Sequence, residues 1–399
     1  MSDSPGSNPL TRFILLYAAM YAAFGVASPF LPSFLSARGL PPEQLGLMLG
    51  AGTAVRLLTA PLAGRIGDLI QALRIVLVIC TALAASATLG YLAAHDVWIL
   101  FGVSLLHAAA LAPITILADA LALGSATPPV HSARRGFEYG WVRGTGSGVF
   151  IIGTLLSGQA VSSFGLDIII WLQALLLAMA ACAGILVPEL IHHRPADIVR
   201  SPAGGVRVLL GIAQFRNLVI VASLILGSHA MHDAFAVIRW SAAGISPGAA
   251  SLLWSESVAA EVFVFFVVGP ALVKRLTPAG ALAMAALAGM LRWTVAAQTT
   301  DVIALGFVQP LHGITFALLH LACMDLIARL VPQGLEGTAQ AIYGTVGIGA
   351  ASALLTLVSG ALYARLGAQG FWVMASLCVF ALPVTLKLRE GVLGQSHRR

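Results

Sequence analysis

The stretch FEYGWVRGTGSGVFIIGTLLSG, residues 137–158, begins with charged and aromatic side chains and continues as an apolar run. An apolar run of about 20 residues is long enough to cross a bilayer as a helix. Arg143 lies inside this stretch, where an unpaired guanidinium at the bilayer centre costs about 3 kcal/mol on insertion scales. The stretch therefore predicts a membrane-spanning helix whose one charged side chain needs a partner or a function.

The rest of the chain has the same apolar character. Of its 399 residues, 59% are hydrophobic and 10% are charged, whereas soluble proteins average about 25% charged residues. We therefore expect an integral protein of the lipid bilayer. The net charge of +6 does not indicate nucleic-acid binding, because its distribution has a topological explanation. Residues 1–10 lack a basic n-region and a small-residue cleavage pattern, so no cleaved signal peptide is expected.

Twelve apolar segments are long enough to span a bilayer. They are expected at 11–36, 44–66, 73–94, 97–124, 140–164, 168–188, 216–242, 249–272, 278–298, 302–330, 338–363 and 369–388. A cytoplasmic N-terminus places sixteen Lys and Arg residues on the inner side and three on the outer side. Because cytoplasmic loops carry the excess of Lys and Arg, we expect both termini in the cytoplasm and a bacterial-type inner membrane.

The longest polar stretch separates the spans into two sets of six. The expected divisions are a cytoplasmic tail at 1–10, a six-helix bundle at 11–188, a cytoplasmic linker at 189–215, a second six-helix bundle at 216–388 and a tail at 389–399.

The two halves resemble each other at an offset of about 205 residues. The matching segments are RGLPPEQLG with AGISPGAAS, LLHAAALAP with PLHGITFAL, and YGWV with YGTV. Because the matches keep their order, they indicate an internal duplication. Both halves begin on the same side, so the repeat is parallel. An all-α membrane protein of twelve helices in two parallel repeats is the major facilitator fold, with its substrate site near the midplane between the halves.

Ionisable side chains at membrane depth are the candidate functional residues of the first half. Asp119 and Arg143 lie on adjacent spans, and we expect them to form a buried ion pair that a substrate enters. The alternative is a structural pair that holds the two helices together. Trp141 is a candidate for stacking on a substrate ring. Glu138 is expected nearer the cytoplasm, where Arg134 or Arg135 could pair with it.

Arg56 and Glu261 occupy equivalent positions of the two repeats with opposite charge. Each could pair within its own half, or the two could meet near the symmetry axis. Glu261 is a candidate proton carrier, with a structural role as the alternative. Arg292 and His312 form a second expected cluster that Asp233 and His232 could join. Since imidazoles titrate near neutral pH, His312 is a further candidate for proton coupling. Asp233 and Asp119 are candidates for the same role. Arg292 and His312 are also candidates for substrate binding.

Several of these segments resemble known transporter families. One such segment is PLAGRIGDLIQALR, which contains Gly64, Asp68 and Arg74. It resembles a degraded form of G-x-x-x-D-R-x-G-R, the gating signature of the major facilitator superfamily. The alternative interpretation is a helix turn capped by Asp68. FEYGWVR resembles the start of span five of the lactose permease, which implies a sugar-binding role at Arg143. The run from Arg292 to His312 resembles the same permease.

The 3-phenylpropionate permease branch is similar over nearly the whole chain. The segments that carry this resemblance include GLMLGAGTAVRLL, GSHAMHDAF, LLWSESVAAEV and QPLHGITFALLHLACM. Compared with the lactose permease, Thr315 stands where a proton-carrying glutamate is expected and Gln309 where a lysine is expected. The resemblance therefore implies transport more strongly than any particular route for protons.

We expect a secondary transporter that takes up a small organic solute, an aromatic carboxylate, together with protons by alternating access. The alternatives are a proton-coupled sugar or nucleoside permease, or an efflux carrier of the same fold. A receptor would need a soluble signalling domain, and the longest polar stretch has about 26 residues. No G-x-S-x-G, H-E-x-x-H or phosphate-loop motif occurs, so no enzyme, cofactor or metal site is expected. We expect a monomer.

Overall fold

The computed structural model describes residues 8–126, 136–189 and 202–396, and these residues form helices without any strand. Ten apolar helical stretches are long enough to cross a membrane. Two of them, Pro247–Gln298 and Glu336–Leu388, have 52 and 53 residues. Each is about twice the length that one crossing needs, so the ten stretches supply twelve crossings. The predicted all-α fold with twelve spans is thereby confirmed.

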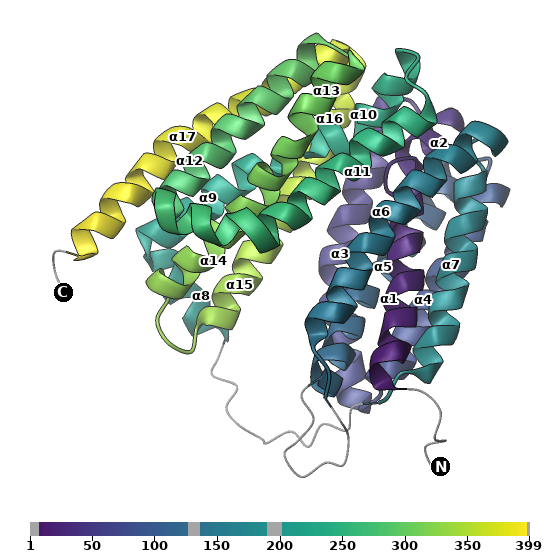
Figure 1. Cartoon of the computed structure of the whole chain (residues 1–399), viewed down its shortest axis with the longest axis horizontal. Helices are drawn as coiled ribbons and strands as arrows, with labels where there is room; N and C mark the ends of the chain where they lie inside the picture. Colours follow the sequence, from purple (N-terminus) through teal and green to yellow (C-terminus); the bar gives the residue numbers. More distant parts are fainter. Residues whose placement is uncertain (1–7, 127–135, 190–201, 397–399) are drawn as a thin grey trace. The chain divides into compact units, whose positions relative to one another are not determined.

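Contacts divide the chain into two compact units, residues 1–38 with 54–195 and residues 39–53 with 196–399. The helices up to residue 189 are α1 (Pro9–Ala27), α2 (Leu31–Ala37), α3 (Pro42–Ile70), α4 (Leu73–Ala93), α5 (Val97–Ala126), α6 (Tyr139–Phe164) and α7 (Ile168–Leu186) (Figure 1). The long helix α3 contributes its first residues to one unit and the remainder to the other.

The later part of the chain is broken into more segments. They are α8 (Pro202–Gly211), α9 (Ala213–Gly227), α10 (Ala230–Ala242), α11 (Pro247–Phe263), η1 (Val264–Val268), α12 (Gly269–Gln298), α13 (Val302–Val308), η2 (Gln309–Leu311), η3 (Gly313–Leu318), α14 (Leu319–Leu330), α15 (Glu336–Ile342), η4 (Tyr343–Ala350), α16 (Ala351–Leu366), η5 (Gly367–Gln369) and α17 (Gly370–Ser396). Segments η1, η3 and η4 are π-helical.

Glycines allow α1 and α6 to pack closely in the first unit. A Cβ atom on Gly25 would overlap the carbonyl oxygen of Phe150, and one on Gly153 would lie 2.9 Å from the carbonyl oxygen of Ala22. The Thr154 hydroxyl donates to the Gly25 carbonyl at 3.0 Å. Small residues that bring helix backbones together are typical of membrane bundles, where water does not drive association. The first and fifth spans therefore use Gly25 and Gly153 for packing against each other.

In the second unit, α12 and α17 lie side by side (Figure 1). The boundary expected between the spans 249–272 and 278–298 lies inside α12 as a break in the helix, because Thr277 has a φ of 63°. The Thr277 hydroxyl accepts a hydrogen bond from the Gly280 amide at 3.3 Å, and Pro278 follows it as the first residue of the next helical segment. This is the chemistry of a helix N-terminus, so Thr277 ends one span and begins another.

Two features differ from the sequence-based expectation. The first expected span, 11–36, is broken at residues 28–30 into α1 and α2. The expected linker 189–215 contains the helix α8, whose Leu209 is fully buried in the core of the second unit. A polar segment can thus be helical when one apolar side chain reaches the core. The expected partners Arg134 and Arg135 of Glu138 lie outside the described residues.

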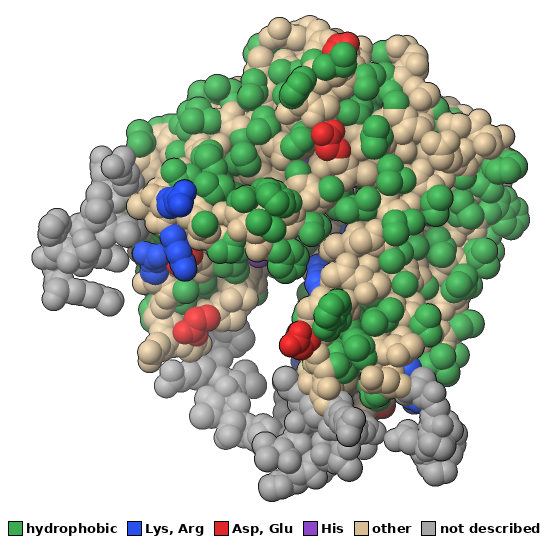
Figure 2. All heavy atoms as spheres, viewed as in Figure 1, with side chains coloured by type: hydrophobic (Ala, Val, Ile, Leu, Met, Phe, Trp, Pro, Cys, Tyr) green, Lys and Arg blue, Asp and Glu red, His purple; other side chains and the backbone are tan. Residues whose placement is uncertain are grey.

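The surface drawn in Figure 2 is consistent with a lipid environment. Hydrophobic side chains are spread over that face, and acidic and basic side chains are sparse. Large apolar side chains such as Trp98, Phe266 and Phe307 are exposed. An extensive apolar surface on a helical protein of this kind is stable in lipid rather than in water.

Candidate functional site

The first cluster of polar side chains centres on Asp119 of α5. Its Oδ1 accepts hydrogen bonds from the hydroxyl of Tyr139 at 2.8 Å and from the hydroxyl of Tyr17. Its Oδ2 lies 3.9 Å from Nη1 of Arg143 on α6. The carboxylate is therefore stabilised by two phenol donors and one cation, which together offset the cost of holding a charge at membrane depth.

Arg143 has a second partner that the sequence did not indicate. Its Nη1 donates to the hydroxyl of Tyr21, and the guanidinium carbon lies 5.4 Å from the centre of the Tyr21 ring. The predicted pairing of Asp119 with Arg143 is confirmed, but the expected burial is wrong. The side chains of Arg143 and Asp119 are 43% and 29% exposed, so the pair remains accessible to a ligand.

The predicted stacking residue Trp141 is not part of this cluster. Its side chain is 66% exposed. Residues two apart on a helix do not share a face, so the indole does not accompany the guanidinium of Arg143. Its role in substrate stacking stays a prediction.

The second cluster is built around Arg292 of α12, which is 1% exposed. Its Nη1 donates to Nδ1 of His312 at 3.3 Å and to the hydroxyl of Thr315 at 3.2 Å, and its Nη2 donates to Oε1 of Gln309 at 3.0 Å. The guanidinium carbon lies 4.6 Å from the centre of the Trp293 ring. The expected cluster of Arg292 with His312 is therefore confirmed, and its direct partners are neutral groups.

His312 connects Arg292 to Glu261. Its Nε2 lies 3.4 Å from Oε2 of Glu261 on α11. Because Arg292 can only donate, Nδ1 of His312 must accept, and the ring proton must then sit on Nε2 and point at the carboxylate. Glu261 therefore pairs within its own repeat, which decides between the two arrangements left open by the sequence. A neutral imidazole satisfies both contacts at once.

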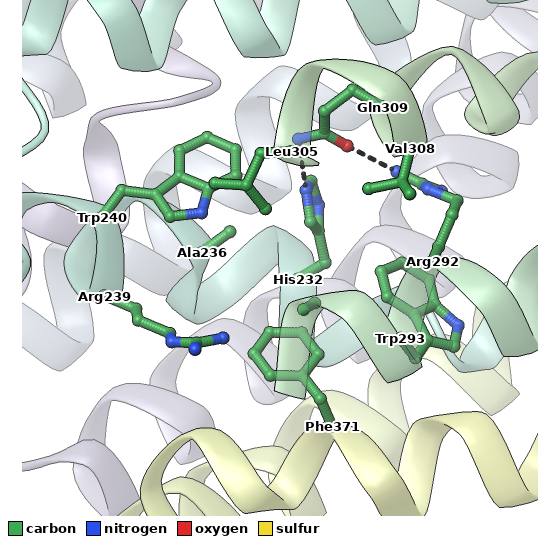
Figure 3. Close-up of a pocket in the computed structure, with 11 residues that line it drawn as sticks. His232, Ala236, Arg239, Trp240, Arg292, Trp293, Leu305, Val308, Gln309 and Phe371 are labelled. Carbon is green, nitrogen blue, oxygen red and sulfur yellow. Dashed lines mark hydrogen bonds between the residues drawn. The ribbon is translucent and has the colours of Figure 1, made fainter. Parts of the chain in front are cut away.

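A second arm of hydrogen bonds leads from Arg292 to Asp233. The amide Nε2 of Gln309 lies 3.2 Å from Nε2 of His232, and Nδ1 of His232 lies 3.3 Å from Oδ1 of Asp233. Figure 3 shows Gln309 between His232 and Arg292. The donors and acceptors have one consistent order, in which Arg292 donates outward and a carboxylate ends each arm. The Asp233 side chain is 62% exposed.

Aromatic rings enclose this network. The indole of Trp254 stacks on His232 with ring centres 5.3 Å apart, and Trp293 donates through Nε1 to the Ser228 hydroxyl at 2.8 Å. A narrow pocket beside the network is lined in part by Trp240, Arg239 and Phe371 (Figure 3). Aromatic rings therefore pack against the network, whereas the Asp233 side chain at the end of one arm is exposed.

The local backbone places Glu261 against His312. A Cβ atom on Gly313 would lie 2.5 Å from the carbonyl oxygen of Ala260, so these two segments touch through their backbones. Ala260 and Gly313 each adjoin one member of the pair. Both π-helical segments η1 and η3 begin within three residues of the pair. Such π-turns frequently occur at functional sites, and no pattern in the sequence indicates them.

The predicted gating residues lie at the end of α3 and the start of α4. Arg74 at the start of α4 lies 3.6 Å from Oε2 of Glu189 and donates to the carbonyl of Val187 at 3.2 Å, so it ties α4 to the end of α7. The carbonyl of Asp68 accepts from the amide of Gln71 at 3.4 Å, which forms the turn before α4. A Cβ atom on Gly64 would meet open space. A gating role for these residues stays a prediction.

Comparison with known proteins adds the family to this geometry. The model of the MFS_1-like family matches residues 10–374. The chain belongs to this family of major facilitator transporters. A "Probable 3-phenylpropionic acid transporter" of Escherichia coli strain K12 is 34% identical over 383 residues, which cover 93% of this chain and 96% of the relative. A maltose permease of Geobacillus stearothermophilus is 25% identical, with 96% of each chain covered.

Solved structures of major facilitator transporters share the fold. The nucleoside transporter NupG superposes with a TM-score of 0.81 at 16% identity, with 96% of this chain and 99% of that chain covered. A bacterial homologue of the lysosomal transporter Spinster gives a TM-score of 0.71 at 13% identity, with 97% of each chain covered. Membership of the family makes this protein a multi-pass membrane transporter of a small molecule, as the resemblance implied.

Proposed function

We propose that this transporter takes up an aromatic carboxylate together with protons by alternating access, across a bacterial inner membrane with both termini in the cytoplasm. The sequence relative named for 3-phenylpropionic acid supports the substrate class. The single observation that carries the coupling is the contact of Glu261 with the neutral imidazole of His312, 3.4 Å apart at membrane depth. We propose that the protein acts as a monomer.

Glu261 is the proposed proton carrier. Its carboxylate accepts the Nε2 proton of His312, and His312 in turn accepts from Arg292. A proton added to Glu261 removes the charge that this imidazole stabilises, and so weakens one arm of the hydrogen-bonded network. The network therefore has two states that differ by one proton, which is what a coupling site requires. Asp233 ends the other arm and is the second proposed proton-binding carboxylate.

The Asp119 cluster is the proposed contact of the first unit with the substrate. Arg143 is accessible, and the hydroxyls of Tyr17 and Tyr139 already bind one carboxylate oxygen of Asp119. A substrate that competes for these donors would change the pairing of Asp119 with Arg143. Such a change links substrate binding to helices α1, α5 and α6.

Uptake by the purified full-length chain in liposomes tests this function. Radiolabelled 3-phenylpropionate is offered with and without a proton gradient directed inward. One coupled proton supports up to about tenfold accumulation per pH unit. We expect accumulation by the wild type and by the control Glu43→Gln, which removes an exposed carboxylate at the start of α3.

The variant Glu261→Gln should lose this accumulation and keep exchange of labelled for unlabelled substrate, because exchange needs no net proton movement. Gradient-driven accumulation by Glu261→Gln at the wild-type level would refute the coupling role. Uptake of maltose or a nucleoside in place of the acid would favour the alternative of a sugar or nucleoside permease, to which the maltose permease relative points.

A further inference from the structure

Arg56 occupies the centre of a long membrane helix. Helix α3 has 29 residues, and Arg56 is its middle residue. At 1.5 Å per residue it lies about 21 Å from either end of the helix. The hydrocarbon core of a bilayer is about 30 Å thick, so a side chain at this depth cannot extend to the headgroups as arginines near helix ends do. Arg56 therefore needs an aqueous pathway or an anion.

No acid of the described chain neutralises this guanidinium. Arg56 is exposed, and within 8–126, 136–189 and 202–396 it makes no hydrogen bond or ion pair. Among the described residues, the ionisable groups that interact with it electrostatically are the phenol of Tyr91 and the imidazole of His107, and neither is a carboxylate. The other guanidiniums at membrane depth differ in this respect. Arg143 faces Asp119, and Arg292 lies in a network ended by two carboxylates.

The surroundings of Arg56 in the first unit are polar and buried. The hydroxyl of Tyr91 lies 3.5 Å from Nδ1 of His107, whose Nε2 lies 3.4 Å from Nε2 of Gln173. His107 also interacts electrostatically with Arg56. Because Nε2 of Gln173 can only donate, Nε2 of His107 accepts, and the proton of His107 lies on Nδ1, facing the Tyr91 oxygen. The Tyr91 hydroxyl can then donate to an oxygen-rich anion beside Arg56.

The internal repeat relates the residues around Arg56 to the Glu261 and His312 pair of the second unit. Arg56 is the repeat equivalent of Glu261, and His107 is the repeat equivalent of His312. In the second unit the pair is an acid with an imidazole in contact, whereas in the first unit it is an arginine with an imidazole nearby. The same scaffold thus offers opposite charges in its two copies. One copy suits a proton and the other suits an anion.

We propose that Arg56 binds the carboxylate group of the transported substrate, with the wall formed by Tyr91, His107 and Gln173 beside it. This inference rests on the proposed function, because it assumes an acidic substrate. It makes Arg56 the charge that selects the acid, while Arg143, already paired with Asp119, contacts other parts of the substrate. An arginine can bind both carboxylate oxygens through its planar fork, which a lysine cannot.

Binding of an acid and of its neutral amide tests the inference. The affinities of 3-phenylpropionate and 3-phenylpropanamide are measured by calorimetry on the full-length protein in lipid nanodiscs. The variants are Arg56→Gln and Arg56→Lys, with Arg365→Gln as the matched control, since Arg365 is exposed at the end of α16. A hydrogen bond between charged groups corresponds to roughly a 10- to 150-fold loss of affinity when one partner is removed.

We expect Arg56→Gln to lose this affinity for the acid and to bind the amide as the wild type does, which also shows that the variant is folded. Arg56→Lys should fall between the two, and Arg365→Gln should match the wild type. Equal acid affinity in Arg56→Gln and wild type would overturn the role of Arg56 while leaving acid transport intact. A wild type that binds neither acid nor amide but binds a sugar would overturn the proposed function and this inference with it.

Discussion

Gly313 is the position where a single methyl group should separate the proposed coupling pair. In Gly313→Ala the new Cβ atom would lie 2.5 Å from the carbonyl oxygen of Ala260 and 2.8 Å from Cγ2 of Val264. The backbone oxygen cannot rotate away as the end of a flexible side chain would. The segments that carry Glu261 and His312 must therefore move apart to reach an ordinary contact distance.

This displacement has a cost that can be estimated. Overpacking of a filled site costs about 1–3 kcal/mol. The His312 to Glu261 contact is already 3.4 Å long, so a shift of several tenths of an ångström takes it beyond hydrogen-bond range. We therefore expect Gly313→Ala to lower the thermal stability of the purified protein and to reduce proton-driven accumulation more than substrate exchange.

The matched control is Gly344→Ala, also in a π-helical segment, where an added Cβ atom meets nothing within 4 Å. Alanine is favoured over glycine in helices by up to about 1 kcal/mol, so this control should keep or raise the stability. Melting temperatures in detergent and liposome uptake are measured for both variants. Equal stability and equal coupling in Gly313→Ala and Gly344→Ala would refute the close-packing argument.

Two further predictions concern the Asp119 cluster. Arg143→Lys keeps the charge but loses the planar guanidinium that contacts Tyr21 and Asp119. The KM for uptake should therefore rise about tenfold while the protein stays folded. An unchanged KM would show that the pair of Asp119 and Arg143 is structural. Tyr139→Phe removes a hydrogen bond to a charged group, worth about 1.5–3 kcal/mol, and should lower the melting temperature. The control Tyr363→Phe, whose ring stacks on Phe235 outside the cluster, should not.

Predictions for the site from sequence were accurate for charges that lie on adjacent spans. Asp119 and Arg143 could be paired because each would be costly alone in the membrane, and the structure places them 3.9 Å apart. The phenols of Tyr17, Tyr21 and Tyr139 were not predicted. Tyrosine is common in membrane helices for packing alone, so only its position in space shows that it donates to Asp119 or accepts from Arg143.

The second network was predicted only in part for a related reason. Arg292 and His312 were expected together, and His232 and Asp233 were expected as further members, but the connecting hydrogen bonds of Gln309 and Thr315 were not predicted. Neutral polar side chains give no electrostatic signal in a sequence. Their partners depend on which helix faces point at each other, and therefore on tertiary packing.

The sequence by itself determined the membrane class, the twelve spans and the duplicated architecture, because apolar length and repeated segments are properties of the chain alone. Only the tertiary structure decided that Glu261 pairs with His312, while its repeat equivalent Arg56 has no acid partner among the described residues. The physical reason is that pairing depends on distances of a few ångströms between helices. Those distances are set by close contacts such as that of Gly313 with Ala260, which no pattern along the chain reveals.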